Sequence, residues 1–172
     1  KEAVALVPKN TKYLMLMSKA LVAKKALDMA VEPLQTAMSL EPKNSAIALA
    51  LCNLYAKKGY HSVAINHCKK ALELNDSDYE VMNRLAWLYA KKGVSIDKAF
   101  ELSQKTLDAR PDKPEYWDTL SELYYARGEV EKAVETIKKA TELSPDDNYY
   151  KQQLWRFKNP KSPTQTQPAF PP

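Results

Sequence analysis

Apolar residues recur along this chain at helical spacing, in short runs that come in pairs. In residues 114–147 the two runs comprise Trp117, Leu120, Leu123 and Tyr124, then Val130, Ala133, Val134 and Ile137. Side chains three and four places apart lie on one face of a helix, so each run predicts an amphipathic helix. Gly128 stands between the runs, where glycine readily adopts the backbone conformation that ends a helix. The pattern therefore predicts a helical hairpin.

The hairpin pattern repeats with a period of 34 or 35 residues. Complete units span 45–78, 79–113 and 114–147, and the extra residue of the middle unit falls in the stretch GVSIDKA. One hairpin cannot bury both of its faces alone, so we expect the units to stack into an all-α, right-handed solenoid with a continuous core.

A fainter copy of the unit occupies residues 11–44. Lys25 replaces its turn glycine, and Pro33 falls inside its second helix, which predicts a kink or a helix start near that proline. Residues 1–10 match only the end of a unit. We therefore expect them to be the end of a truncated repeat, with at least one further repeat before Lys1.

The pattern breaks after residue 147. Residues 148–158 still suit a helix, but Trp155 stands where a unit would place a small residue, and the other side chains are largely polar. This composition predicts a capping helix that shields the open end of the array. Residues 159–172 are rich in proline and favour an extended conformation. We expect this tail to dock in a groove of its own or of a neighbouring copy, with Phe170 as its apolar contact.

The repeated residues resemble the tetratricopeptide repeat family, whose unit follows the pattern W-x₂-L-G-x₂-Y…A-x₃-F…A…P. The unit 114–147 matches best, through Trp117, Leu120, Ser121, Tyr124, Ala133, Ile137, Ala140 and Pro145. Asp76 departs from the pattern by replacing the proline at the end of the unit 45–78. Pentatricopeptide repeats, which read RNA, have a similar period, but the small residues and glycines here fit the tetratricopeptide pattern better.

The resemblance implies a protein-binding scaffold whose concave groove is lined by the first helix of each hairpin. The groove positions it implies are Lys12, Met15, Lys19, Val22, Leu49, Asn53, Lys57, Glu80, Asn83, Trp87, Lys91, Glu115, Asp118, Glu122 and Tyr125. Trp87 is expected to project into the groove as an aromatic anchor. The alternative is that it packs against a neighbouring hairpin or the tail. Asn53 and Asn83 are expected to hydrogen-bond the backbone of an extended peptide.

Charge is distributed unevenly along the chain, whose net charge is +5. Residues 1–72 hold eleven lysines and four acidic residues, whereas residues 114–147 hold nine acidic and four basic ones. The groove should thus grade from basic to acidic and suit a ligand with a basic stretch over the last hairpin. The basic residues Arg156, Lys158 and Lys161 also suit that acidic hairpin. Such polarity can steer partners or stack copies.

Two histidines and both cysteines lie in the unit 45–78 and raise the hypothesis of a metal site. His67 and Cys68 are adjacent on a helix and point about 100° apart, so their spacing argues against one. Cys52 is expected to face Cys68 across the hairpin. The favoured interpretation is a pair of buried thiols, and a disulfide remains the alternative if the protein is exported.

The sequence favours no enzymatic function. It lacks a Ser-His-Asp order and a glycine-rich phosphate loop, since its three glycines all fall in helix turns. No cofactor or metal is expected. The apolar runs are too short to insert into a membrane, no signal peptide is visible, and the compartment stays unknown. Nucleic acid is not expected as a partner because the basic front lacks interleaved aromatic residues. Two hypotheses remain: a peptide- or protein-binding adaptor, and a scaffold that self-associates through its tail or its ends.

Overall fold

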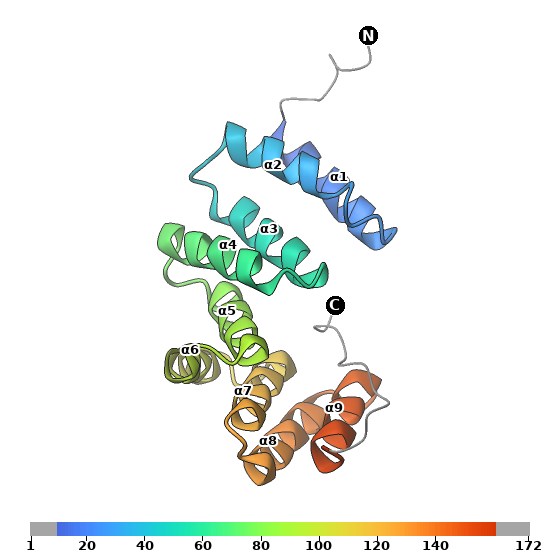
Figure 1. Ribbon diagram of the computed structural model, residues 1–172, viewed down its shortest axis with the longest axis vertical. Coiled ribbons are helices and arrows are strands. Elements are labelled where there is room, and N and C mark those ends of the chain that lie inside the picture. Colours follow the sequence, from blue (N-terminus) through green and yellow to red (C-terminus); the bar gives the residue numbers. More distant parts are fainter. Residues whose placement is uncertain (1–9, 161–172) are drawn as a thin grey trace. The chain divides into compact units, whose positions relative to one another are not determined.

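The computed structural model describes residues 10–160, and these residues form helices without any strand. The predicted all-α fold is confirmed. In chain order the helices are α1 (Thr11–Ala23), α2 (Val31–Leu40), α3 (Ser45–Lys57), α4 (His61–Leu74), α5 (Tyr79–Lys92), α6 (Ile96–Ala109), α7 (Pro114–Ala126), α8 (Val130–Leu143) and α9 (Asn148–Lys158). Successive helices from α1 to α8 pack as four hairpins (Figure 1). The residues of the tail, including Phe170, and residues 1–9 lie outside the described part.

The helices belong to two compact units, residues 1–78 and residues 79–172, and each is described by itself. Unit 1 contains α1 to α4, and unit 2 contains α5 to α9. Within unit 2 the helix α9 packs against α8, which leaves α9 without a hairpin partner of its own among the described residues (Figure 1).

The turns inside the hairpins depend on a left-handed residue after the first helix. Gly59, Gly93 and Gly128 have φ angles of 79°, 65° and 82° there, a region that favours glycine. In the first hairpin Lys25 occupies this place with a φ of 60°. The turn that carries the extra residue uses a second left-handed position, Ser95, before α6 begins.

Helix starts follow the capping residues. Oδ1 of Asn44 accepts a hydrogen bond from the backbone of Ala46 at 3.0 Å, which satisfies an amide that the helix α3 itself cannot pair. Asp147 caps α9 in the same way. Pro33 lies in the first turn of α2, where a proline is tolerated because no intrahelical donor is lost. The sequence predicted either a kink or a helix start near Pro33, and the structure shows a helix start.

The core of unit 1 joins α1, α2 and α3. Its buried members are Leu14, Ala30, Leu34, Ala37, Ile47, Leu51 and Leu54. A disulfide links Cys52 of α3 to Cys68 of α4, so the interpretation of two free thiols is wrong. The two Cα atoms lie 5.2 Å apart across the hairpin, within the range that a disulfide spans. The sequence placed these side chains opposite each other but did not show that they are bonded.

Two apolar clusters hold unit 2 together. Leu107 of α6 packs with Tyr116 and Leu120 of α7. On the other side, Ala133, Ile137 and Ala140 of α8 pack with Tyr150 and Phe157 of α9. Phe157 is fully buried, so α9 is anchored by apolar contacts as well as by the polar ones described next.

Candidate functional site

The first helices of unit 1 present the predicted groove residues at helical spacing. Lys12 and Lys19 of α1 are exposed, and Lys57 of α3 is exposed as well. The apolar or amide members are half-buried: Met15, Leu49 and Asn53. On α1 the residues Lys12, Met15 and Lys19 stand three and four places apart, so they share one face of that helix. On α3 the residues Leu49, Asn53 and Lys57 stand four places apart and do the same. This face therefore combines cationic side chains with partly buried ones that a ligand can contact.

Asn53 has a buried acceptor that nothing in its surroundings uses. Its Oδ1 atom is shielded from solvent and receives no hydrogen bond within residues 10–160. Oδ1 of Asn83 in unit 2 is in the same state, and the Asn83 side chain is only 2% exposed. Buried polar atoms in native proteins are normally hydrogen-bonded, and one that is not calls for an explanation.

Trp87 of α5 is only 4% exposed, so its indole is not presented openly to a ligand. Nζ of Lys91 lies 5.2 Å from the centre of the Trp87 ring, within cation–π distance. Burial favours the alternative in which Trp87 is a packing residue over the expectation that it projects into the groove. The sequence could not distinguish the two, because both place a tryptophan beside the small residue Ala86.

A cluster of buried polar side chains connects α5, α7 and α9, and we call it the polar cluster. Its members are Lys91, Asp118, Glu122, Tyr149, Gln153 and Arg156. Asp118 and Glu122 stand one turn apart on α7 and are 0% and 4% exposed. The sequence predicted both as open acidic residues of the groove. The structure instead covers them with side chains of α9, so a ligand reaches them only if α9 moves.

Glu122 receives both cations of the polar cluster. Its Oε1 atom lies 2.7 Å from Nζ of Lys91 and accepts a hydrogen bond from Nη2 of Arg156. Nε2 of Gln153 donates to the same oxygen at 2.8 Å. Burial disfavours the charged form of Glu122, but the two cations outweigh it and lower the pKa of this carboxyl below its ordinary value.

Asp118 differs from Glu122 because its hydrogen bonds within residues 10–160 come from neutral groups. The Tyr149 hydroxyl donates to Oδ2 at 3.1 Å, and Nε2 of Gln153 donates to Oδ1 at 3.2 Å. Complete burial and the charge of nearby Glu122 raise the pKa of Asp118 to about 7, although Lys91 and the two hydrogen bonds act in the opposite direction. The polar cluster thus holds one carboxyl whose pKa is lowered and one whose pKa is raised to about 7.

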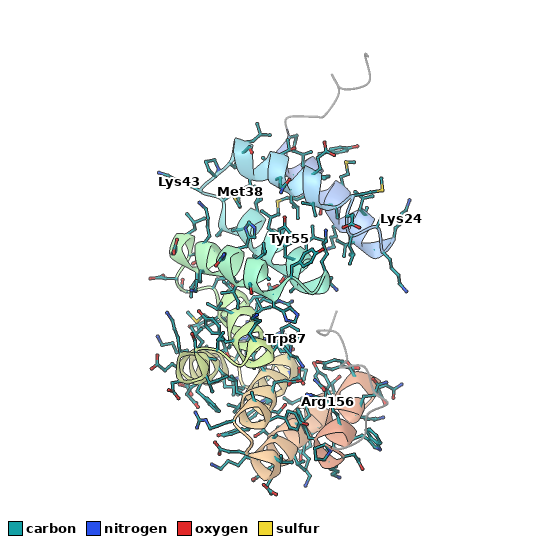
Figure 2. The ribbon with its side chains drawn as sticks, in the orientation of Figure 1. Lys24, Met38, Lys43, Tyr55, Trp87 and Arg156 are labelled. Carbon is teal, nitrogen blue, oxygen red and sulfur yellow. A yellow bond between two sulfur atoms is a disulfide. The ribbon has the colours of Figure 1, made fainter. Side chains whose placement is uncertain are left out.

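Arg156 is a residue of α9 (Figure 2), and its guanidinium reaches Glu122 while lying close to two neighbouring aromatic rings. The centre of its guanidinium is 4.9 Å from the Tyr125 ring and 4.5 Å from the Phe157 ring. Its Nε atom donates to Oε1 of Gln153 at 2.9 Å. The predicted attraction between the basic end of the chain and the acidic hairpin therefore holds for Arg156, whereas Lys158 is exposed.

Tyr149 and Gln153 were not predicted as functional residues. The available signal was their spacing with Arg156, because positions i, i+4 and i+7 place all three on one face of α9. That face would have predicted a polar contact, but its target on α7 depends on how α9 packs.

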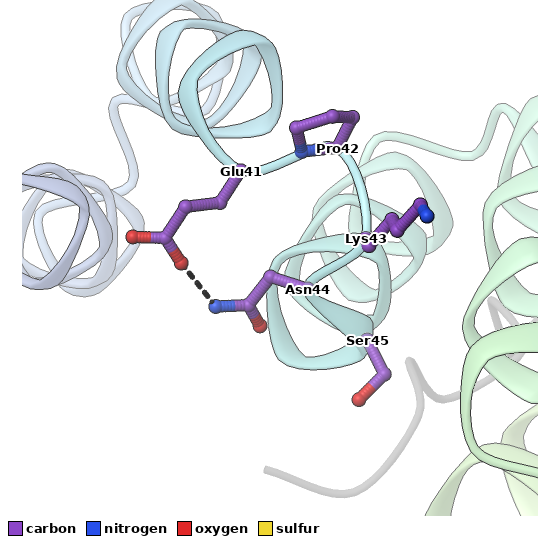
Figure 3. A pocket seen from close by; sticks show the side chains of 5 residues that line it. All are labelled: Glu41, Pro42, Lys43, Asn44 and Ser45. Carbon is purple, nitrogen blue, oxygen red and sulfur yellow. Dashed lines mark hydrogen bonds between the residues drawn. The ribbon is translucent and has the colours of Figure 1, made fainter.

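An open depression of about 630 Å³ lies beside the loop between α2 and α3 (Figure 3). It is lined by Glu41, Pro42, Lys43, Asn44 and Ser45. The Glu41 carboxylate accepts hydrogen bonds from Thr11 and Asn44, which lower its pKa. These polar groups serve the loop and the start of α3, so we assign no catalytic role to the depression.

The histidines have a structural setting. His67 stacks on Tyr55 with ring centres 5.3 Å apart, and burial together with nearby Lys70 lowers its pKa. Among residues 10–160, no group of three His, Cys, Asp or Glu side chains could hold a metal ion. None of the helices in this part of the chain is long and apolar enough to cross a membrane.

Comparison with known proteins connects the fold to a family. The family described as tetratricopeptide repeat matches residues 95–154. The solved structure of MamA from residue 41 onward, from Desulfovibrio magneticus RS-1, superposes with a TM-score of 0.73 at 20% identity, covering 91% of this chain and 88% of that one. TTC0263, a thermophilic TPR protein of Thermus thermophilus, gives a TM-score of 0.71 at 23% identity, with 88% and 82% covered.

PilF from Pseudomonas aeruginosa is a third similar structure, with a TM-score of 0.71 at 13% identity, covering 86% of this chain and 67% of that one. No curated protein sequence matches the chain significantly. At these identities the structural likeness concerns the fold alone.

Proposed function

Because this chain is a tetratricopeptide repeat protein by its fold and by the family match over residues 95–154, we propose that it binds an extended peptide or a partner-protein segment along the first helices of its hairpins. Proteins of this family generally serve as scaffolds for protein–protein interaction and are typically not enzymes. No catalytic step is proposed, since the strongest group of titratable side chains, the polar cluster, is buried.

The observation that carries the proposal is the unused acceptor of Asn53. A buried oxygen without a donor costs about 1–3 kcal/mol, which a backbone N–H of a bound peptide would recover. Asn83 in unit 2 is only 2% exposed, so a ligand does not reach its Oδ1 atom in this conformation. A ligand that satisfies Asn53 through its main chain needs little sequence identity of its own.

The exposed lysines of unit 1 add a preference for charge. Lys12, Lys19 and Lys57 are exposed on the first helices, whereas the acidic pair of α7 is already covered. The ligand that fits is therefore acidic where it contacts unit 1. Its affinity should fall as ionic strength rises, because exposed charge pairs are screened by salt.

The test uses two asparagines of the same hairpin. Peptides selected on the wild-type chain from a displayed library would be measured by calorimetry against Asn53→Leu and Asn66→Leu. Asn66 is exposed on the second helix α4 and serves as the matched control. We expect Asn53→Leu to weaken binding about 10-fold, as for loss of one hydrogen bond of about 1.5 kcal/mol. Equal affinity of both variants for the selected peptides would remove the groove proposal.

A second candidate function, self-association, is favoured by the outer face of α1. Tyr13, Leu16 and Met17 are 53%, 64% and 44% exposed. In the next repeat Ile47 and Leu51 of α3 occupy the places of Tyr13 and Met17, and they are 0% and 1% exposed. Leu16→Lys would disrupt contact through this face. Light scattering would show a dimer or polymer lost in that variant, and a wild-type monomer would exclude self-association through α1.

A further inference from the structure

We propose that α9 is a built-in competitor, and that the polar cluster is an arginine-binding site which α9 fills in cis with Arg156. The ligand that would replace α9 is a helical segment of a partner protein with an arginine beside an aromatic residue. The inference rests on the proposed protein-binding function and names a second partner chemistry for unit 2.

Once a helix covers it, the acidic pair of α7 requires a cation in addition to Lys91. Asp118 and Glu122 are buried together, and Lys91 of α5 is the cation that unit 2 supplies before α9 is counted. Two carboxylates beside one ammonium leave an excess of negative charge when Asp118 is ionised, and burying such a charge unpaired is costly. Arg156 supplies the missing positive charge.

The site suits arginine better than lysine. The guanidinium uses two nitrogens at once, since Nη2 donates to Glu122 and Nε donates to Gln153. Its central carbon lies 4.9 Å from the centre of the Tyr125 ring, within cation–π distance. A lysine ammonium lacks both the second fixed donor and the planar stacking surface.

The seam between α7 and α9 has the composition of an exchangeable contact. It is formed largely by charged and amide side chains, with the aromatic contact of Tyr125 and Phe157 beside them, whereas α7 meets α6 through Leu107, Tyr116 and Leu120. A buried ion pair adds little net stability compared with apolar packing of similar volume. The outer face of α9 is open, with Trp155 41% exposed. A helix packed on one side near the end of a unit opens at lower free energy than the core.

A peptide copy of α9 serves as the probe: NYYKQQLWRFK, blocked at both ends and labelled. It would be titrated into the full chain carrying Arg156→Ala, which removes the arginine that fills the site in cis, and into the matched control Lys158→Ala, which removes an exposed charge from the same helix. We expect the probe to bind Arg156→Ala about 10-fold tighter than either the control or the wild type. A probe with alanine in place of its arginine should bind Arg156→Ala about 10-fold more weakly than the intact probe.

A measurement on the wild-type chain keeps the proposal testable if Arg156→Ala fails to fold. Excess probe should speed amide exchange in α9 of the wild type, because it competes for the same site, and the alanine probe should not. Equal binding of both probes would overturn the proposal. Faster amide exchange in every helix, rather than in α9 alone, would overturn it as well. A dimer that exchanges α9 between copies, seen by light scattering, would also overturn it in favour of a second copy as the occupant.

The groove proposal fails or succeeds separately. Asn53→Leu, made in the Arg156→Ala chain, should leave the affinity for the α9 probe unchanged, since Asn53 lies in unit 1 and outside the polar cluster. Loss of probe binding in that double variant would show that the two sites are one.

Discussion

Asp118 and Glu122 show how neighbouring carboxyls on one helix acquire opposite properties. Both are almost completely buried, yet the pKa of Glu122 is lowered and that of Asp118 is raised to about 7. The difference lies in their partners. Lys91 and Arg156 both pair with Glu122, whereas Asp118 accepts hydrogen bonds from Tyr149 and Gln153. A cation in direct contact offsets the cost of burial, and a neutral donor offsets only part of it.

The raised pKa of Asp118 makes the stability of unit 2 depend on pH. The unfolded chain ionises Asp118 from its ordinary value near 3.8, while the folded chain retains the proton until about 7. The folded state therefore binds more protons between these values, so its free energy of unfolding falls as pH rises through this range and levels off above 7. The variant Asp118→Asn has no carboxyl at this position, so its free energy of unfolding should not fall in this way as pH rises. Relative to wild type we expect it to gain up to about 4 kcal/mol between pH 4 and pH 8.

Denaturant unfolding of both chains across that pH range measures the effect. Asp146→Asn is the control, because its side chain is exposed and should leave the pH profile of the wild type unchanged. Parallel profiles for wild type and Asp118→Asn would show that Asp118 is ionised in the folded chain well below pH 7.

Lys25 carries local strain that glycine would relieve. Its φ of 60° lies in the left-handed region, which costs a residue with a side chain about 1 kcal/mol. Lys25→Gly should therefore raise the free energy of unfolding of unit 1 by up to about 1 kcal/mol. Lys24→Gly should lower it by a similar amount, because Lys24 has an ordinary φ of −80° and glycine only adds freedom to the unfolded chain. Thermal unfolding of the two variants decides, and effects of the same sign would contradict the argument.

At the scale of the element, the disulfide staples the hairpin of α3 and α4. Cys52 and Cys68 are separated by 16 positions, a loop for which closure stabilises a protein by about 3 kcal/mol. Reduction should lower the free energy of unfolding of unit 1 by about 2–4 kcal/mol. The measurement is chemical unfolding with and without reductant. The double variant Cys52→Ala and Cys68→Ala is the control and should not respond to reductant.

The hairpins could be predicted from the sequence, because the features that specify them are local. The apolar spacing, the glycine after each first helix and the caps such as Asn44 act over a few residues and repeat along the chain. The presence of Lys25 at the place of the turn glycine could be recognised from the same repeat pattern. The sequence could predict that Cys52 faces Cys68, because their spacing places them opposite each other. It could not predict the disulfide, because spacing does not show the oxidation state of the two cysteines.

The polar cluster lay beyond sequence reasoning for a different reason. Asp118 and Glu122 were recognised as an acidic pair on one helix face, but Gln153 comes from a helix 31 to 35 positions later. Which side of α9 meets α7 is decided by the burial of Phe157 and Tyr150 against α8. A pattern along one helix cannot contain that packing, so residues assigned to an open groove proved to be covered.

At the scale of the whole molecule, the uneven charge of the sequence has a different expression in each unit. The lysines of unit 1 remain exposed on α1 and α3, while the acidic pair of unit 2 is neutralised internally by Lys91 and Arg156. The part of the predicted charge gradient that rests on Asp118 and Glu122 is therefore covered by α9, whereas the lysines of α1 and α3 remain open to a ligand.

The two units should also respond separately to changes made in either one. In repeat proteins each repeat contacts only its neighbours, so stability is a sum of local terms and a local change is felt locally. Reductant acts on the disulfide of unit 1, and Asp118→Asn acts on the polar cluster of unit 2. Amide exchange followed by mass spectrometry at pH 8 should show faster exchange in α3 and α4 after reduction, with α7 to α9 unchanged. Asp118→Asn should slow exchange in α7 to α9 and leave α1 to α4 as in the wild type. If reduction speeds exchange equally in both units, the chain unfolds as one cooperative body, and the separate roles proposed for the two units lose their basis.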